Sequence, residues 1–576
     1  PITRRPYRLT LAPYGVLWLE LHGTPELGEV RGSEFDQTAL PVGAGWEGLF
    51  EGLGRHRLEN TLLPEYLPKQ RWFGGKSRRI QSTQVVDWAV LDGANAALAI
   101  VSVQYENGGE EKYFVPLAMT FGESVNQLRE AAPTSVLVPV VAPDGAGVLH
   151  DAVFHDDARR AILALIENAA ELRARRGSIR GVTSPTFSEV RGDEDSLPSR
   201  PGSAEQSNSS ILYGDRLILK LFRRQQVGPN PDCEMGAYLT ENVRFENVPP
   251  YAGSIEYVGE GAQTAALGVL HGLIDNEGDG WRWTMEELER YYENCAPVPY
   301  PGEEAAAARY DLIGLSEAPA SELARDHVGL YLEAAATLGR RTAELHLALS
   351  NPASDPVFAP EKLSPEDFLA LFTGMRDHAA RALDALKEAV SGFPDEVVEL
   401  AGLVLSRRRQ ILDRFRPGEI GDMYALRTRI HGDYHLGQVL RVKTDFVIFD
   451  FEGEAARTLA ERRAKHSPLK DVAGMLRSFS YAAYASLMNY TARRPEDFTR
   501  LEPWARLWER SAAAEFLRGY REAAQGAAYL PCNAEGFRRV LETYLLDKAL
   551  YEVLYEMDNR PAWVRIPLLG MRSILV

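Results

Sequence analysis

One segment near residue 440 restricts most strongly how this chain can fold. Two short apolar runs flank a turn centred on Thr444; Gln438 opens the first run and Asp450 closes the second. If the runs pair as a hairpin about Thr444, Gln438 and Asp450 lie opposite each other, with Asp433 on the loop just before. Three polar side chains at this spacing on an apolar hairpin are costly to bury unless they perform a function.

The residue types in this segment suit phosphoryl transfer. A carboxylate can orient a hydroxyl group, and oxygen ligands hold the Mg²⁺ that gathers phosphate charge. We therefore predict Asp433 as the catalytic carboxylate and Gln438 and Asp450 as metal ligands. The alternative is a buried hairpin whose polar residues are incidental.

A nucleotide-binding hairpin is predicted upstream, because a strand over 216–222 follows a polar loop and a Gly214-Asp215 turn. Lys220 shares one face of that strand with two apolar neighbours, which is costly unless an anion such as an ATP phosphate meets it. The alternative is an edge-strand lysine that reaches solvent. The polar loop supplies the predicted phosphate contacts: Ser207, Asn208, Ser209 and Ser210.

A helix is expected to begin near Gly228-Pro-Asn-Pro, and this places an acid, Glu234, in its first turn. We predict that Glu234 pairs with Lys220 and orients it. The helix dipole alone would also favour an acid at this position.

An acceptor site is predicted on a helix that includes residues 545–556. Four of its residues, Lys548, Tyr551, Glu552 and Tyr555, fall on one stripe at helical spacing. Aromatic rings stack on the C–H faces of sugars and charged groups bind hydroxyls, so the stripe indicates sugar recognition. The alternative is a solvated helix face with ordinary ion pairs.

These segments resemble the kinase-like fold in its aminoglycoside-phosphotransferase branch, and within it the maltokinase family. The resemblance covers roughly residues 56–576. It rests on His431-Gly-Asp433 with Gln438 in place of the usual Asn, and on the segments 71–78, 205–210, 461–479 and 548–556. It implies an α+β, bilobal kinase-like fold with an N-terminal cap subdomain, a mixed-sheet nucleotide lobe and a helical C-lobe.

The resemblance also implies an activity. ATP and Mg²⁺ would be the cofactors and maltose the acceptor, giving maltose 1-phosphate for α-glucan (glycogen) synthesis from trehalose or maltose. A trehalose synthase, fused or associated, would be the partner. Glucosamine or another sugar as the acceptor, and a catalytically silent kinase-like binding module, stay open as alternatives.

Four segments are expected along the chain. Residues 1–45 read as a β-strand remnant resembling the C-terminal domain of trehalose synthases, followed by a linker. The cap subdomain covers 46–185, the nucleotide-binding lobe 186–284, and the helical lobe 285–576. The segment Arg71–Lys76 has no role assigned from sequence.

Net charge limits the expected binding partners, and cysteine content indicates the expected cellular compartment. A net charge of −17 argues against binding to nucleic acid or to anionic membranes. No apolar run reaches the ~18 residues that a membrane span needs. The three cysteines are far apart and odd in number, which favours a reduced, cytoplasmic setting.

Overall fold

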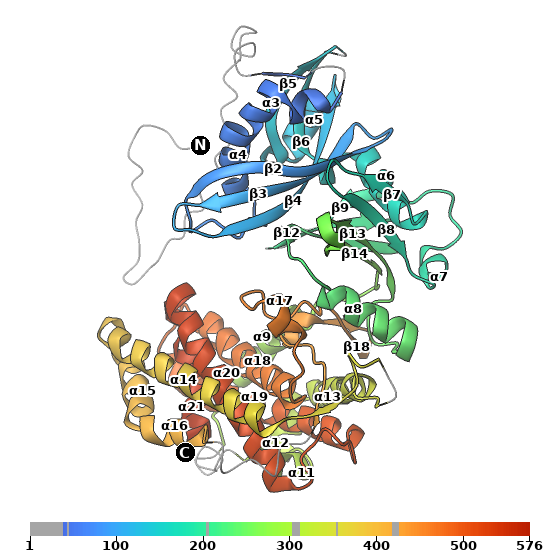
Figure 1. Ribbon diagram of the computed structural model, residues 1–576. Coiled ribbons are helices and arrows are strands. Elements are labelled where there is room, and N and C mark those ends of the chain that lie inside the picture. Colours follow the sequence, from blue (N-terminus) through green and yellow to red (C-terminus); the bar gives the residue numbers. More distant parts are fainter. Residues whose placement is uncertain are drawn as a thin grey trace.

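The computed structural model describes residues 39–42, 45–143, 145–202, 207–301, 311–352, 355–416 and 426–575. Two β-sheets lie one after the other above a large helical lobe (Figure 1), so the predicted α+β architecture is confirmed. Residues 1–38, which include the strand remnant predicted within residues 1–45, lie outside the described residues. In the described part of the chain, no helix is long and apolar enough to cross a membrane.

The first sheet forms the cap. Its strands are β1 (Leu40–Pro41), β2 (Ile80–Leu91), β3 (Ala96–Tyr105), β4 (Glu110–Phe121), β5 (Val136–Ala142) and β6 (Gly145–Asp151), in the order β1-β5-β6-β4-β3-β2. Because β1 runs parallel to β5, the cap sheet already begins at Leu40, ahead of the predicted linker boundary at residue 45.

Strand β3 explains why the cap sheet is buried on both sides. Side chains alternate between the two faces of a strand. Ala97, Ala99 and Val101 join the core under the N-terminal helices α3 (Gly52–Arg57) and α4 (Leu63–Tyr66). Leu98 and Ile100 point the other way and share a core with the second sheet. The two sheets are therefore joined by one hydrophobic core.

The second sheet carries the predicted nucleotide hairpin. Its order is β7-β8-β13-β14-β11-β10-β9, with β7 (Glu171–Arg173), β8 (Ser178–Thr183), β9 (Ser199–Pro201), β10 (Asn208–Tyr213), β11 (Leu217–Phe222), β13 (Tyr251–Val258) and β14 (Thr264–Gly272). Helix α6 (Asp156–Glu167) packs on β8. After α6 the backbone turns at Ala169 (φ 45°) and continues as β7.

The helical lobe is built on one large core. Its helices are α9 (Gly280–Cys295), α11 (Leu312–Glu317), α12 (Glu322–Val328), α13 (Tyr331–Ala348), α14 (Pro365–Ala389), α15 (Asp395–Ser406), α16 (Arg408–Arg414), α18 (Leu469–Tyr490), α19 (Asp497–Ala523), α20 (Ala534–Asn559) and α21 (Arg565–Leu575). Helices α13 and α19 approach closely at Gly339 and Gly519, where an added Cβ would lie 2.0 Å from a backbone oxygen of the facing helix.

Two short segments connect the three parts. Helix α8 (Pro231–Ala237) leads from the second sheet toward the helical lobe, whose core includes Met235. Strand β12 (Arg224–Gln225) leaves the second sheet and pairs with β4 of the cap. Just before β12, buried Arg223 donates to Asp151 of the cap (2.7 Å) and to Ser209 of β10 (2.9 Å).

Candidate active site

The predicted hairpin exists, with a register that differs by one residue. Strands β17 (Val439–Val442) and β18 (Asp445–Ile448) pair with Val442 opposite Asp445. The turn therefore has two residues, Lys443 and Thr444, where the prediction had three. Two-residue loops are the commonest hairpin turns, and they need positive φ angles such as that of Lys443 (55°).

Gln438 and Asp450 still come together, by a different route. Gln438 lies opposite Phe449, whose N–H donates to the Gln438 carbonyl (3.1 Å). Asp450 follows with a left-handed backbone (φ 66°), which costs a non-glycine residue roughly 1–3 kcal/mol. Its carboxylate accepts a hydrogen bond from the Gln438 side chain. Backbone strain at Asp450, rather than cross-strand pairing, brings the two predicted metal ligands together.

The buried carboxylate of Asp471 stabilises the loop that carries Asp433. Asp471 accepts from the backbone N–H of His431 (2.7 Å) and of Gly432 (2.9 Å), and its side chain also contacts His346 (3.2 Å). His431 in turn contacts the Phe449 carbonyl through Nε2 (2.9 Å). Both histidines therefore support the loop, His431 directly and His346 through Asp471.

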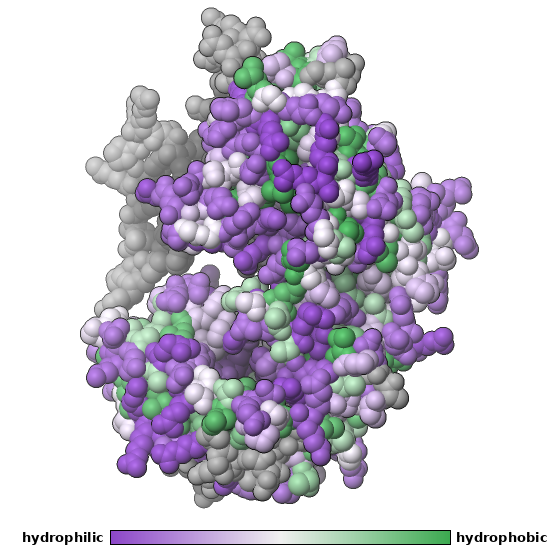
Figure 2. Space-filling view, viewed as in Figure 1, coloured by the Kyte–Doolittle hydropathy of each residue, from purple (hydrophilic) through white to green (hydrophobic). Residues whose placement is uncertain are grey.

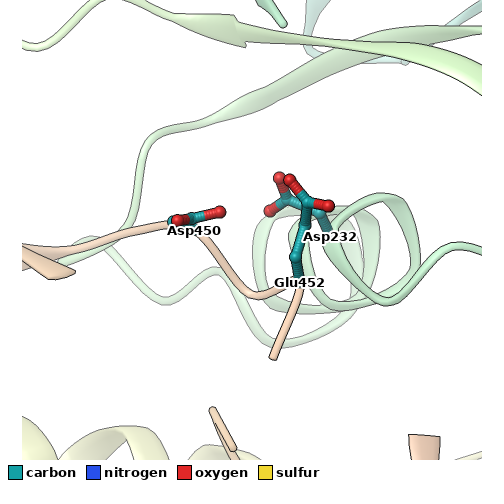
Figure 3. Close-up of side chains that lie close together, drawn as sticks. All are labelled: Asp232, Asp450 and Glu452. Atoms are coloured by element: carbon teal, nitrogen blue, oxygen red, sulfur yellow. The ribbon is translucent and has the colours of Figure 1, made fainter. Parts of the chain in front are cut away.

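Lys220 sits among three carboxylates. Its Nζ lies 2.5 Å from Asp450, 2.5 Å from Glu452 and 3.3 Å from Asp232. Figure 3 shows these three acids converging from helix α8 and from the segment after β18. Ligand oxygens of all three lie within 4.8 Å of one another. The structure thus unites the predicted phosphate-binding lysine with one predicted metal ligand, Asp450.

The electrostatics of this cluster are asymmetric. Burial favours the protonated, neutral form of both Asp450 and Glu452. In Asp450, however, Lys220 and the Gln438 amide outweigh burial and hold the pKa below its ordinary value. The pKa of Glu452 is raised, because burial and the neighbouring Asp450 and Asp232 outweigh Lys220. Hard oxygen donors of this kind fit Mg²⁺.

Sequence reasoning missed Asp232 and Glu452. Glu452 follows Asp450 by two residues inside the segment already singled out, so its position was a usable signal. Asp232 lies on α8, where Asn230 caps the helix by accepting from the N–H groups of Asp232 and Cys233. One Asp232 oxygen contacts Lys220, and the other accepts from the Phe451 N–H (3.1 Å).

The prediction that Glu234 orients Lys220 is wrong. Glu234 lies two residues beyond Asp232, about 200° further around the helix, and faces elsewhere. Its oxygens accept from Arg463 (2.7 Å each) and from Arg429 (3.3 Å). The helix acid beside Lys220 is Asp232.

The residues of the predicted phosphate loop point in different directions, because side chains alternate between the two faces of strand β10. Ser210 is the register partner of Lys220 on β11, and Asn208 donates to Glu452 (2.7 Å). Ser209 projects from the opposite face, where its hydroxyl accepts from Arg223. Ser207 is exposed before the strand. The hydroxyls of Ser209 and Ser210 therefore cannot both point to the phosphate side.

A cavity of about 460 Å³ lies in the helical lobe beside Asp433. On the face drawn in Figure 2, the surface is hollowed between the upper and lower lobes and is mostly hydrophilic. Lining side chains that carry charge or an aromatic ring include His378, Arg381, Glu454, Arg457, Arg462, Lys470, Tyr544, Asp547, Lys548 and Tyr551.

Two of the four predicted acceptor residues line this cavity. Lys548 and Tyr551 of α20 both face it, and Lys548 Nζ lies 3.9 Å from Asp433 and 3.8 Å from Glu454. Burial alone would lower the pKa of Lys548, but Asp433 and Glu454 raise it above its ordinary value, so the side chain stays charged. Tyr555 stacks on Tyr551 (6.4 Å between ring centroids, 21°) and is 44% exposed.

The prediction that Glu552 faces the acceptor is wrong. Glu552 is 7% exposed, it accepts a hydrogen bond from Nε of Arg477 on α18 (2.9 Å), and its carboxylate lies 2.8 Å from Nη2 of the same guanidinium. Successive residues of a helix point about 100° apart, so Glu552 faces α18 while its neighbour Tyr551 faces the cavity. The predicted stripe therefore divides between two faces of α20. One face lines the cavity, and the other is buried against α18.

Comparison with known proteins identifies the cap. Residues 66–154 match the family described as Maltokinase N-terminal cap domain. A glucosamine kinase from Streptacidiphilus jiangxiensis is 24% identical over 460 residues, which cover 79% of this chain and 89% of that protein. A glucosamine kinase from Mycolicibacterium smegmatis is 24% identical over 378 residues, covering 65% and 79%.

Solved structures share the fold. A glucosamine kinase in complex with glucosamine, ADP and inorganic phosphate superposes with a TM-score of 0.57 at 19% identity, covering 86% of this chain and 94% of that one. A second crystal form of a glucosamine kinase gives 0.57 at 20% identity over 89% and 98%. The predicted bilobal kinase-like architecture is confirmed by this similarity.

Proposed function

We propose that this chain, which has a maltokinase-like kinase fold, is a sugar kinase that transfers the γ-phosphoryl group of ATP to the anomeric hydroxyl of maltose. Its substrates would be ATP and maltose, and its products ADP and maltose 1-phosphate. A trehalose synthase that supplies maltose remains part of the proposal through the resemblance of residues 1–21 alone.

One observation carries the proposal: Asp433 and the cavity beside it are joined through Lys548. Lys548 lines the cavity with Tyr551 and also lies 3.9 Å from Asp433. A small molecule in this cavity would therefore have a ring-stacking surface on one side and the proposed catalytic carboxylate at its end. The cavity volume falls within the roughly 300–1,000 Å³ range of small-molecule sites.

The proposed reaction assigns a task to each group. The anomeric oxygen attacks the γ-phosphorus, the bond from that phosphorus to the β,γ-bridging oxygen breaks, and ADP leaves. Asp433 orients the hydroxyl and accepts its proton. Lys220 binds the ATP phosphates, while Asp450, Gln438 and Glu452 would hold Mg²⁺. When bound, Mg²⁺ neutralises phosphate charge.

A second acceptor has support of its own. The curated relatives described above are glucosamine kinases, at 24% identity. Glucosamine carries an ammonium group, which Glu454 and Asp547 could receive in the same cavity. The charged Lys548 in that cavity opposes a cationic acceptor, and this favours maltose.

The test is an acceptor panel with ATP and Mg²⁺, measured as ADP release and product mass. Maltose, glucose, glucosamine and trehalose are compared with maltitol, which keeps the non-reducing ring of maltose but lacks a cyclic anomeric hydroxyl. We expect maltose to give the highest kcat/KM and maltitol to give no product.

The outcomes separate the candidates. A higher kcat/KM for glucosamine would replace maltose by the second acceptor. Phosphorylation of maltitol would place the reaction at another hydroxyl and contradict the assignment to the anomeric position. No ADP release with any sugar would favour a silent binding module.

A further inference from the structure

Arg462 is a buried arginine that borders both halves of the site. It lies on the short helix α17 (Leu459–Arg463) and is 5% exposed at its side chain. It lines the acceptor cavity. Its guanidinium also donates to the Gln226 side chain, in the segment between β12 and α8.

The stem of Arg462 is fixed against the segment that follows the proposed metal ligand. Nη1 donates to the Glu452 carbonyl (3.1 Å), two residues after Asp450. The methylene groups pack on Gly453, where an added Cβ would lie 3.5 Å from Arg462 Cβ and Cγ. Gly453 has a φ of 72°, so a side chain there would be strained as well as crowded.

One donor of this guanidinium lacks a partner. Among the described residues, Nε of Arg462 is buried without a hydrogen bond. A buried, unsatisfied donor on a charged group is costly, so such a group normally meets an acceptor in the working molecule. The carboxylate of Glu452 lies 3.9 Å from Nη1 of Arg462 and is already engaged by Lys220 and Asn208.

The surroundings suit an anion. Burial lowers the pKa of Arg462, partly offset by Glu452 and lowered further by the nearby Arg224. Arg224 is the first residue of β12, on the cap side of the site. Arg224 is already paired with Glu111 of the cap (2.8 Å), so the guanidinium of Arg462, which lines the acceptor cavity, is the positive group that an anion there would meet.

We propose that Arg462 contacts the γ-phosphoryl group of ATP and stabilises the negative charge on its oxygens during transfer. This inference rests on the proposed kinase function and adds a catalytic residue to it. The phosphorus–oxygen bonds that form and break are those already given, and Arg462 keeps its proton throughout. An arginine suits this task because its planar fork binds two phosphate oxygens at once.

The test compares nucleotides that differ by the γ-phosphate. Affinities for AMP-PNP and ADP with Mg²⁺ are measured by calorimetry for the wild type and for Arg462→Gln and Arg462→Lys. We expect Arg462→Gln to weaken AMP-PNP binding about ten- to a hundredfold while ADP binding changes little. Arg462→Lys, which keeps the charge without the fork, should fall in between.

Arg463→Gln is the matched control. It removes a guanidinium group from the same helix. Arg463 binds Glu234, and it is not among the described residues that line the cavity. We expect it to leave the ratio of the two affinities unchanged. Equal loss for AMP-PNP and ADP in the Arg462 variants would make Arg462 a structural residue and overturn the inference.

Turnover provides a second measurement. Arg462→Gln should lower kcat by on the order of 10²-fold or more with the best acceptor of the panel. If the wild type phosphorylates no sugar but the AMP-PNP difference persists, the kinase proposal fails while the γ-phosphate contact stands. If the wild type is active and neither Arg462 variant alters the affinity ratio, only the contact fails. Should Arg462→Gln not fold, Arg462→Lys decides.

Discussion

At the scale of single residues, Asp433 is the side chain on which the proposed transfer depends most. Asp433→Asn keeps the shape but loses the ability to accept the hydroxyl proton. We expect ADP release to fall by on the order of 10²-fold or more, because positioned proton acceptors contribute about that much. Steady-state turnover with maltose checks this.

The loop around Asp433 should survive the change, since Asp471 holds it through backbone N–H groups of other residues. ATP affinity and the thermal midpoint should therefore stay close to wild type. Turnover above about a tenth of wild type, outside the range for a proton acceptor, would remove Asp433 from the catalytic role.

Residue identity was easier to predict than residue direction. Lys220 and Asp450 were each singled out from sequence, because a lysine on an apolar strand face and an acid at a strand end both require a charged partner, but their mutual contact was not predicted. The acid on α8 was misassigned. Asp232 and Glu234 both occupy the first turn of the helix. The rotation of α8 about its own axis decides which of the two acids contacts Lys220 on β11. That rotation depends on tertiary packing.

At the scale of elements, helix α20 presents different chemistry on its two sides. Tyr551→Ala removes a ring from the cavity wall, and we expect the KM for maltose to rise roughly tenfold or more with little change in the KM for ATP. Kinetics with each substrate varied separately measures both values. An unchanged KM for maltose would mean that the sugar does not rest on Tyr551.

The opposite side of α20 should respond through stability. Glu552→Gln leaves the Arg477 guanidinium buried without its counter-charge, which typically costs about 3–5 kcal/mol. Urea unfolding should reveal the loss while the KM for maltose of the folded enzyme changes little. Arg477→Met combined with Glu552→Leu should recover much of the stability, because an apolar pair can replace a buried ion pair. A raised KM without lost stability would return Glu552 to the acceptor site.

The same helix illustrates what pattern alone can supply. Spacing at three and four residues predicted one polar stripe, and that stripe spans about 100° of the helix. Nothing in the spacing tells which part of so wide an arc a neighbouring helix will cover. The hairpin at residue 443 is similar: its existence followed from the apolar runs, but its register followed from the two-residue turn.

Strand β6 of the cap contains a buried histidine that makes stability depend on pH. Burial lowers the pKa of His150 to about 4, and its neutral ring bonds Thr120 and the Asp151 carbonyl. An unfolded histidine takes up a proton near pH 6.5. Between these values the unfolded state binds more protons, so the free energy of unfolding falls as the pH drops from 6.5 to 4.

His150→Gln tests this by removing the titration while keeping hydrogen bonds possible. We expect the slope of the unfolding free energy against pH to become flatter below pH 6.5, by up to about 1.4 kcal/mol per pH unit. Urea midpoints at several pH values, followed through the cap tryptophans, provide the measurement. Parallel curves for the two proteins would show that another group controls the acid response.

At the scale of the whole molecule, the hydrophobic cores define which parts should unfold together. The cap and the second sheet share one core, whereas Met235 of α8 belongs to the core of the helical lobe. We expect hydrogen exchange in mild urea to group β3 with β11 and to group α8 with the helices below. Exchange of α8 together with β11 would contradict this division.

The predicted boundaries at 185 and 284 remain predictions, yet the sheets explain why such boundaries are hard to read from sequence. Strands β7 and β8 lie before residue 185 and pair within the second sheet. Composition does not change there, because strands of both sheets are buried on the shared core. Only the pairing partners differ, and these are distant in the chain.

Strand β12 affects whether the cap can be exchanged between proteins as one continuous segment. The family match ends at residue 154, yet Arg224 and Gln225 complete the same sheet some seventy residues later. The cap is therefore not a detachable N-terminal block. Recombination that exchanges residues 66–154 between two such proteins would pair a foreign β4 with a resident β12 and a foreign Asp151 with a resident Arg223. A successful chimera would have to inherit residues 223–226 from the same parent as its cap.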